Sequence, residues 1–161
     1  MKPGSKVLDI GSGSGYLLAI FHHIVGESGK VVGIEHVPEL VDWSAENLRK
    51  DGLGKCLDVK QIEVIVGDGR NGCPEKGKYI IEQLLVTELL NPEILLIGPY
   101  DAIHVGAAAP DVPSSLVEQL ASPGRMFIPV GVYMQDVQRV DKDKNGRVTQ
   151  QSIMSVSVRS L

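Results

Sequence analysis

Cysteine is scarce in this sequence, which has only Cys56 and Cys73 among 161 residues. Two cysteines are too few for a disulfide framework, and their spacing is not that of a zinc site, so we expect reduced, unreactive thiols. Basic residues are also few, since 16 Lys and Arg stand against 20 Asp and Glu and give a net charge of -4. A chain without a basic excess is poorly suited to hold phosphate backbones, which argues against nucleic acid as a partner.

Long apolar runs are missing as well. The most apolar stretch, residues 80–97, is interrupted by three glutamates, an asparagine and a proline. A lipid-spanning helix carries such residues only at high cost, so we expect no membrane span. The N-terminus shows no charged region followed by a long apolar run and a small-residue cleavage site, so we expect a cytoplasmic protein.

What the sequence does contain is an alternation of short β-branched runs with longer helical patterns, typical of a parallel sheet covered on both faces. The composition, 43% apolar and 22% charged, is that of an ordinary globular protein. We therefore predict a single domain over residues 1–161. The expected strands are residues 6–10, 30–35, 63–66, 100–105 and 125–130, and the expected helices are residues 16–25, 39–50 and 113–120.

The C-terminal part departs from this alternation. Residues 136–140 and 148–158 flank Asn145-Gly146, a strong hairpin signal, so we expect an antiparallel pair there. Ser122-Pro123-Gly124 predicts a turn before the strand at 125–130. The predicted fold class is α/β, with a mixed and mostly parallel sheet of seven strands that ends in an antiparallel pair.

Three alternate glycines, Gly11, Gly13 and Gly15, follow the first expected strand and precede the first helix. Glycine there lets the backbone turn sharply and lets a ligand approach main-chain atoms. The dinucleotide fingerprint needs a glycine three positions after its second, where this sequence has Tyr16. Asp9 adds a negative charge that suits a cationic ligand better than a pyrophosphate. S-adenosylmethionine is therefore favoured over NAD or FAD.

Two further strand ends carry acidic residues. Glu35 ends the second expected strand, where a carboxylate can accept hydrogen bonds from ribose hydroxyls. Asp68 follows the third strand and can accept from an adenine amino group, while Gly69 leaves the ring room to approach the backbone. Taken singly, each residue also fits an ordinary turn or a solvated strand end. Their joint order favours an adenosine-containing ligand at the carboxyl ends of the strands.

These segments resemble the protein-L-isoaspartate (D-aspartate) O-methyltransferase family. The resemblance covers residues 7–15, 29–49, 64–72, 100–113 and 116–131, and is most specific in Asp101-Ala102-Ile103-His104-Val105-Gly106-Ala107-Ala108-Ala109-Pro110. It implies the Rossmann-like fold of the class I S-adenosylmethionine-dependent methyltransferases, with S-adenosyl-L-methionine as cofactor. It also implies that Asp9, Gly11, Ser12 and Gly13 line the methionine side, that Glu35 and His36 meet the ribose and its surroundings, and that Asp68 and Gly69 hold the adenine.

The same resemblance implies an activity. The family transfers a methyl group to the side-chain carboxylate of isoaspartyl residues, and the ester collapses to a succinimide that reopens partly as normal aspartate. We therefore expect an enzyme that initiates the repair of damaged proteins, with L-isoaspartyl and D-aspartyl peptides and proteins as partners. We expect no metal site and a monomer.

The resemblance is incomplete in three places. The family has an N-terminal segment with a serine that contacts substrate, and no residue here matches it, so no catalytic residue is assigned. Residues 78–99 form an apolar insert without a match, and residues 154–161 only loosely resemble the family's last strand. We therefore expect a domain incomplete at both ends, with weakened adenosyl binding and still weaker methyl transfer.

Two other functions remain open. A truncated, non-catalytic isoform would act as a binding or interaction protein through the apolar residues 80–97. A small-molecule methyltransferase would share the glycine loop and Glu35, but it does not explain the resemblance over residues 104–110.

Several aromatic side chains are expected to have no chemistry. His104 lies in an apolar strand, where a histidine is more often a hydrogen-bonded packing residue. His22 and His23 lack the spacing of metal ligands, and Trp43 is placed at helical spacing that predicts a core position.

Overall fold

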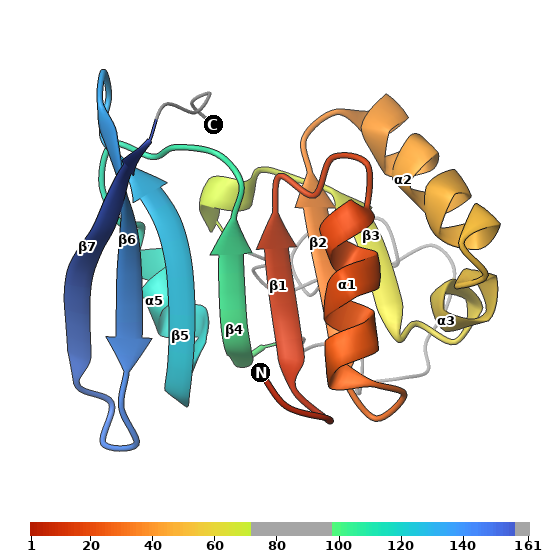
Figure 1. The fold of residues 1–161 in the computed structure, drawn as a ribbon, viewed down its shortest axis with the longest axis horizontal. Helices are drawn as coiled ribbons and strands as arrows, with labels where there is room; N and C mark the ends of the chain where they lie inside the picture. Colours follow the sequence, from red (N-terminus) through yellow and green to blue (C-terminus); the bar gives the residue numbers. More distant parts are fainter. Residues whose placement is uncertain (72–97, 157–161) are drawn as a thin grey trace, which may run out of the picture.

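The computed structural model describes residues 1–71 and 98–156. It confirms the predicted α/β fold, with one seven-stranded mixed sheet in the order β3-β2-β1-β4-β5-β6-β7 (Figure 1). All but two residues of the expected insert at 78–99, together with the apolar stretch 80–97 and Cys73, lie outside the described residues. Of the helices in the described ranges, none has the length and apolar character needed to cross a membrane.

The sheet is parallel from β3 to β5 and antiparallel from β5 to β7. The antiparallel pairing of β6 with β7 follows from the Asn145-Gly146 turn, where Gly146 adopts a φ of 81° that favours glycine. The strands are β1 (Lys6–Ile10), β2 (Lys30–Glu35), β3 (Ile62–Val66), β4 (Tyr100–Val105), β5 (Leu120–Val130), β6 (Gln135–Lys142) and β7 (Val148–Val156).

Helices cover both faces of the sheet. On one face lie α1 (Tyr16–Val25), α2 (Pro38–Lys50) and α3 (Gly54–Asp58), with α1 directly over β1 and β2 (Figure 1). Leu18 and Phe21 of α1 pack there against Val7 of β1. On the opposite face α5 (Ser114–Gln119) buries Leu116 against the other side of the sheet. Burial of these apolar surfaces is the main stabilising contribution, and it divides the core into two layers.

The six-residue helix α5 is anchored by a side chain of strand β6. Lys142 at the end of β6 donates hydrogen bonds from Nζ to the carbonyl oxygens of Val117 and Leu120, both at 3.0 Å. These carbonyls belong to the end of α5, where that of Val117 also accepts from the backbone N–H of Leu120. A cation at this end also interacts favourably with the helix dipole.

The structure corrects two local predictions. Trp43 is 49% exposed and is not a core residue. The buried residues of α2 are Ser44 and Leu48, one turn apart, and Trp43 lies about 100° away around the helix. Ser122-Pro123-Gly124 lies within β5, not before it, because β5 begins at Leu120 and bulges between its pairings with β4.

Candidate functional site

The glycine loop between β1 and α1 is fixed by hydrogen bonds to the neighbouring strand. The backbone N–H groups of Gly11 and Ser12 both donate to the carbonyl oxygen of Ile34, at 2.8 and 3.2 Å. Gly15 ends the loop with a φ of 81°, and a Cβ atom there would clash with Oγ of Ser44. Only glycine satisfies both conditions, so the loop passes close over the sheet where α2 approaches.

Glu35, at the end of β2, joins this loop to the turn before α2. The residue is 5% exposed, and its Oε2 accepts a hydrogen bond from the backbone N–H of Gly13 at 3.1 Å. Its Oε1 accepts from the backbone N–H groups of His36 and Val37, at 2.8 and 3.2 Å, and lies 2.9 Å from Nδ1 of His36. The predicted ribose acceptor therefore also organises the backbone, while Oε2 has one remaining acceptor position.

Asp9 and Ser12 contribute buried polar atoms that have no partner among the described residues. Asp9 is 1% exposed; its Oδ1 lies 2.7 Å from Nδ1 of His104, and its Oδ2 is unpaired. Oγ of Ser12 is also unpaired, and it lies over Gly33, where a Cβ atom would approach it to 2.9 Å. Gly33 is the register partner of Asp9. Because unpaired buried polar atoms are costly, these two fit the polar end of a ligand.

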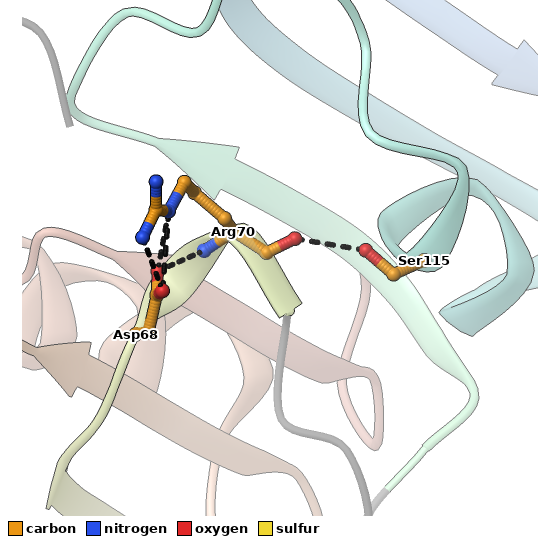
Figure 2. A network of polar contacts seen from close by, with 3 residues as sticks. All are labelled: Asp68, Arg70 and Ser115. Carbon is orange, nitrogen blue, oxygen red and sulfur yellow. Dashed lines mark hydrogen bonds and ion pairs between the residues drawn. The ribbon is translucent and has the colours of Figure 1, made fainter.

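Asp68 lies beyond β3 in an exposed ion pair (Figure 2). The guanidinium of Arg70 donates to both carboxylate oxygens, with Nη2 to Oδ2 at 2.7 Å, and the backbone N–H of Arg70 donates to Oδ1 at 3.1 Å. These hydrogen bonds hold the pKa of the Asp68 carboxyl below its usual value, and the same contact raises the pKa of Arg70. The carboxylate is therefore an ionised acceptor.

The loop that carries Asp68 is connected to α5. Oγ of Ser115 donates to the carbonyl oxygen of Arg70 at 2.8 Å, which joins the short 3-10 helix at Gly69–Asn71 to α5 (Figure 2). Gly69 packs directly on β1, since a Cβ atom there would overlap Cγ2 of Ile10. The absence of a side chain at Gly69 is thus required by packing, in addition to the role predicted for it.

Backbone hydrogen bonds bring the four strand ends together. Gly67 donates from its N–H to the carbonyl oxygen of Glu35 at 3.0 Å, and Gly106 donates to the carbonyl oxygen of Ile10 at 2.8 Å. The carboxyl ends of β3, β2, β1 and β4 therefore lie along one edge (Figure 1). All eight predicted site residues come from this edge: Asp9, Gly11, Ser12, Gly13, Glu35, His36, Asp68 and Gly69. Ligands of open α/β sheets bind at such an edge.

Sequence reasoning missed the pairing of His104 with Asp9. The histidine is hydrogen-bonded, as expected, but its partner is a predicted site residue. A signal was available, because His104 stands two residues before Gly106 as Asp9 stands two before Gly11. Strands that pair in parallel and end together place such residues side by side, and Asp9 and His104 are register partners.

The remaining histidines lie away from this edge. Nε2 of His22 in α1 is 3.3 Å from Sγ of Cys56, which is a free thiol of α3. Burial, reinforced by the neighbouring His23, lowers the pKa of His22 below its ordinary value of 6.5. In the ranges 1–71 and 98–156, no three His, Cys, Asp or Glu side chains are grouped to hold a metal ion.

Relatives of known name match the chain along nearly its whole length. Protein-L-isoaspartate O-methyltransferase 1 of Arabidopsis thaliana is 44% identical over 149 residues, which are 92% of this chain and 56% of the relative. The protein-L-isoaspartate O-methyltransferase of Caenorhabditis elegans is 42% identical over 159 residues, which are 95% of this chain and 59% of the relative. The chain thus spans a little over half the length of these relatives.

A solved structure and a family model agree with these relatives. A Plasmodium falciparum crystal structure, described as a protein-L-isoaspartate O-methyltransferase in complex with S-adenosyl-L-homocysteine, superimposes with a TM-score of 0.77 and 30% identity, covering 99% of this chain and 66% of that one. The family model for protein-L-isoaspartate(D-aspartate) O-methyltransferase matches residues 1–88 and 96–159, leaving residues 89–95 unmatched inside the range interpreted as an insert. The chain belongs to the protein-L-isoaspartate(D-aspartate) O-methyltransferase family.

Proposed function

We propose that the chain binds S-adenosyl-L-methionine and transfers its methyl group to the side-chain carboxylate of L-isoaspartyl and D-aspartyl residues in damaged proteins, which initiates their repair. The observation that carries this proposal is the alignment of the glycine loop, Glu35 and Asp68 along one sheet edge. Family membership and the S-adenosyl-L-homocysteine bound to the Plasmodium falciparum protein support it.

The residues at this edge fit the chemistry of the cofactor from end to end. The unpaired Oδ2 of Asp9 and Oγ of Ser12 would meet the polar amino-acid end. Oε2 of Glu35 keeps an acceptor position for a ribose hydroxyl, and the ionised Asp68 would accept from the adenine amino group. When bound, the cofactor supplies a methyl group that is activated by the adjacent sulfonium.

The residues of the chain have to align the methyl donor with the acceptor carboxylate, and they do not have to transfer a proton. A carboxylate with a reference pKa of about 4 is already ionised at neutral pH, so the acceptor needs no general base. Correct placement of donor and acceptor can supply about 7–11 kcal/mol of the barrier in favourable cases. The rigid loop between Gly11 and Gly15 therefore matters because it fixes where the donor lies.

The other expected functions have less support. Neither the geometry nor the family match favours a non-catalytic interaction protein, and a small-molecule methyltransferase does not account for the family match. A cytoplasmic location, a monomeric state and the absence of nucleic-acid and membrane partners stay predictions from the sequence.

Calorimetric titration of the folded chain with S-adenosyl-L-homocysteine tests the cofactor part of the proposal. We expect binding that is lost in Asp68→Ala. Asp58→Ala is the matched control, because Asp58 forms an exposed ion pair with Arg49 at 2.9 Å, comparable with the pair of Asp68 and Arg70. Absence of binding by the folded wild-type chain would contradict the proposal, as would equal effects of the two substitutions.

Methyl transfer to a synthetic peptide tests the acceptor part. We expect incorporation into a peptide that contains L-isoaspartate and none into the same peptide with normal L-aspartate. Binding of the cofactor without transfer to the isoaspartyl peptide would leave the cofactor site standing and refute the proposed activity of this chain.

A further inference from the structure

Asp9 and His104 form a polar pair between the neighbouring strands β1 and β4. They are register partners on β1 and β4, and Gly33 of β2 and Phe127 of β5 continue the same row on the flanking strands. Asp9 stands one residue before Ile10, and His104 stands two residues before Gly106. The backbone N–H of Gly106 donates to the carbonyl oxygen of Ile10. Asp9 and His104 therefore lie close to the carboxyl ends of β1 and β4.

The geometry of the pair assigns one role to each oxygen of Asp9. An ionised carboxylate only accepts hydrogen bonds, so at 2.7 Å the Nδ1 atom of His104 must carry the proton and donate it to Oδ1. Oδ2 is buried and has no partner among the described residues. With Oδ1 held, the carboxylate cannot rotate freely and Oδ2 is left without a partner among the described residues. Oγ of Ser12, which lies over Gly33, the register partner of Asp9, is also unpaired.

Among the described residues, the hydrogen bond to Asp9 is the polar contact of the His104 ring. The side chain is 35% exposed and contacts Phe21 of α1 at a ring-centroid distance of 6.1 Å. It lines a cavity of about 690 Å³, together with Phe127 and Arg125 of β5. A residue placed only for packing would gain more from full burial, so the hydrogen bond to Asp9 is its principal specific contact.

We propose that His104 is a positioning residue that orients Asp9, so that Oδ2 faces the cationic amino-acid end of the bound S-adenosyl compound. This inference rests on the proposed function, and it assigns to His104 the discrimination of the amino-acid end from the nucleoside end. Substitution of His104 therefore weakens ligands that carry the α-ammonium group and spares ligands that lack it. A packing role alone predicts equal effects on both.

Two ligands separate these possibilities in calorimetric titrations. S-adenosyl-L-homocysteine carries the amino-acid end, whereas 5′-methylthioadenosine keeps the nucleoside and lacks that end. We expect His104→Leu to weaken S-adenosyl-L-homocysteine at least tenfold and to change 5′-methylthioadenosine less than twofold. Phe127→Leu, the neighbour in the same row and cavity, is the matched control, and we expect less than a twofold effect on either ligand.

A second pair of variants keeps the test valid if His104→Leu does not fold. His104→Asn places an amide N–H near the position of Nδ1, whereas His104→Gln places it near Nε2. We expect His104→Asn to retain most of the affinity for S-adenosyl-L-homocysteine and His104→Gln to lose it. Proton NMR of the wild-type chain adds a ligand-free readout, because a slowly exchanging Nδ1–H of His104 should be visible and should vanish in Asp9→Asn.

Each result decides the inference. Equal loss of both ligands in His104→Leu, or equal behaviour of His104→Asn and His104→Gln, would overturn it and leave the proposed function intact. If the wild-type chain bound neither ligand, the proposed function would fail and this inference with it. If 5′-methylthioadenosine bound as tightly as S-adenosyl-L-homocysteine, the nucleoside site would stand and the role of Oδ2 would be refuted.

Discussion

Replacement of Glu35 by glutamine tests whether one buried carboxylate holds the glycine loop. In the wild-type chain Oε2 accepts from the N–H of Gly13, and Oε1 accepts from the N–H groups of His36 and Val37. Glutamine has one acceptor oxygen and one NH2 group, so either orientation of the amide sets an NH2 against a backbone N–H. At least one partly buried backbone donor then loses its partner.

The expected cost follows from that count. A buried donor without a partner costs about 1–3 kcal/mol, and hydrogen bonds to a charged acceptor lie toward the upper end of this range. We therefore expect Glu35→Gln to lower the free energy of unfolding by about 2 kcal/mol. Glu35→Ala removes the acceptor from all three N–H groups and should cost more. Glu35→Gln should also weaken binding of S-adenosyl-L-homocysteine, because the loop and the proposed ribose acceptor change together.

Urea unfolding followed by circular dichroism measures the effect. Asp42→Asn, an exposed substitution on α2 that also removes one negative charge, is the control and should stay within about 0.5 kcal/mol of wild type. The reasoning would be refuted if Glu35→Gln and Asp42→Asn were equally stable. It would also be refuted if Glu35→Gln were more destabilised than Glu35→Ala.

Two further substitutions test packing and protonation. Gly69→Ala places a methyl group into Ile10 and should cost about 1–3 kcal/mol in urea unfolding, whereas Gly67→Ala meets its nearest side-chain atom at 3.4 Å and should cost less; equal costs would argue against the packing role. His22 has a pKa lowered by burial and by His23, so between that value and 6.5 the unfolded chain binds a proton that the folded chain does not. Stability should therefore fall as the pH is lowered through this window, by at most about 1.4 kcal/mol per unit, and His22→Gln should reduce the slope. An unchanged slope would contradict the assignment.

Much of the fold was predictable because its signals are local. The strand at residues 6–10, the helix at 16–25 and the C-terminal hairpin each follow from periodicity and turn chemistry in their own segment. The exposure of Trp43 was not predictable in this way, because the choice of the buried stripe on α2 depends on what α1 and β3 present to it. The bulge in β5 likewise depends on its register with β4.

The candidate site shows the same division. The glycines and the acidic strand ends identify the edge, since each stands at a fixed place after its own strand. The engagement of Glu35 by three backbone N–H groups and of Asp68 by Arg70 was not visible, because those partners are set by the path of the backbone after each strand. The pairing of Asp9 with His104 joins residues 95 positions apart and required the order of the sheet.

The contact of Lys142 with α5 links the loop that carries Asp68 to a part of the chain remote in sequence. A helix of six residues is too short to persist alone in water, so α5 depends on its anchors. Lys142 holds the end of α5, and Ser115 at its start holds the carbonyl of Arg70, which in turn fixes Asp68. The β6–β7 hairpin therefore supports, through α5, the loop that carries Asp68. A modification that neutralises Lys142 would remove this support from the loop.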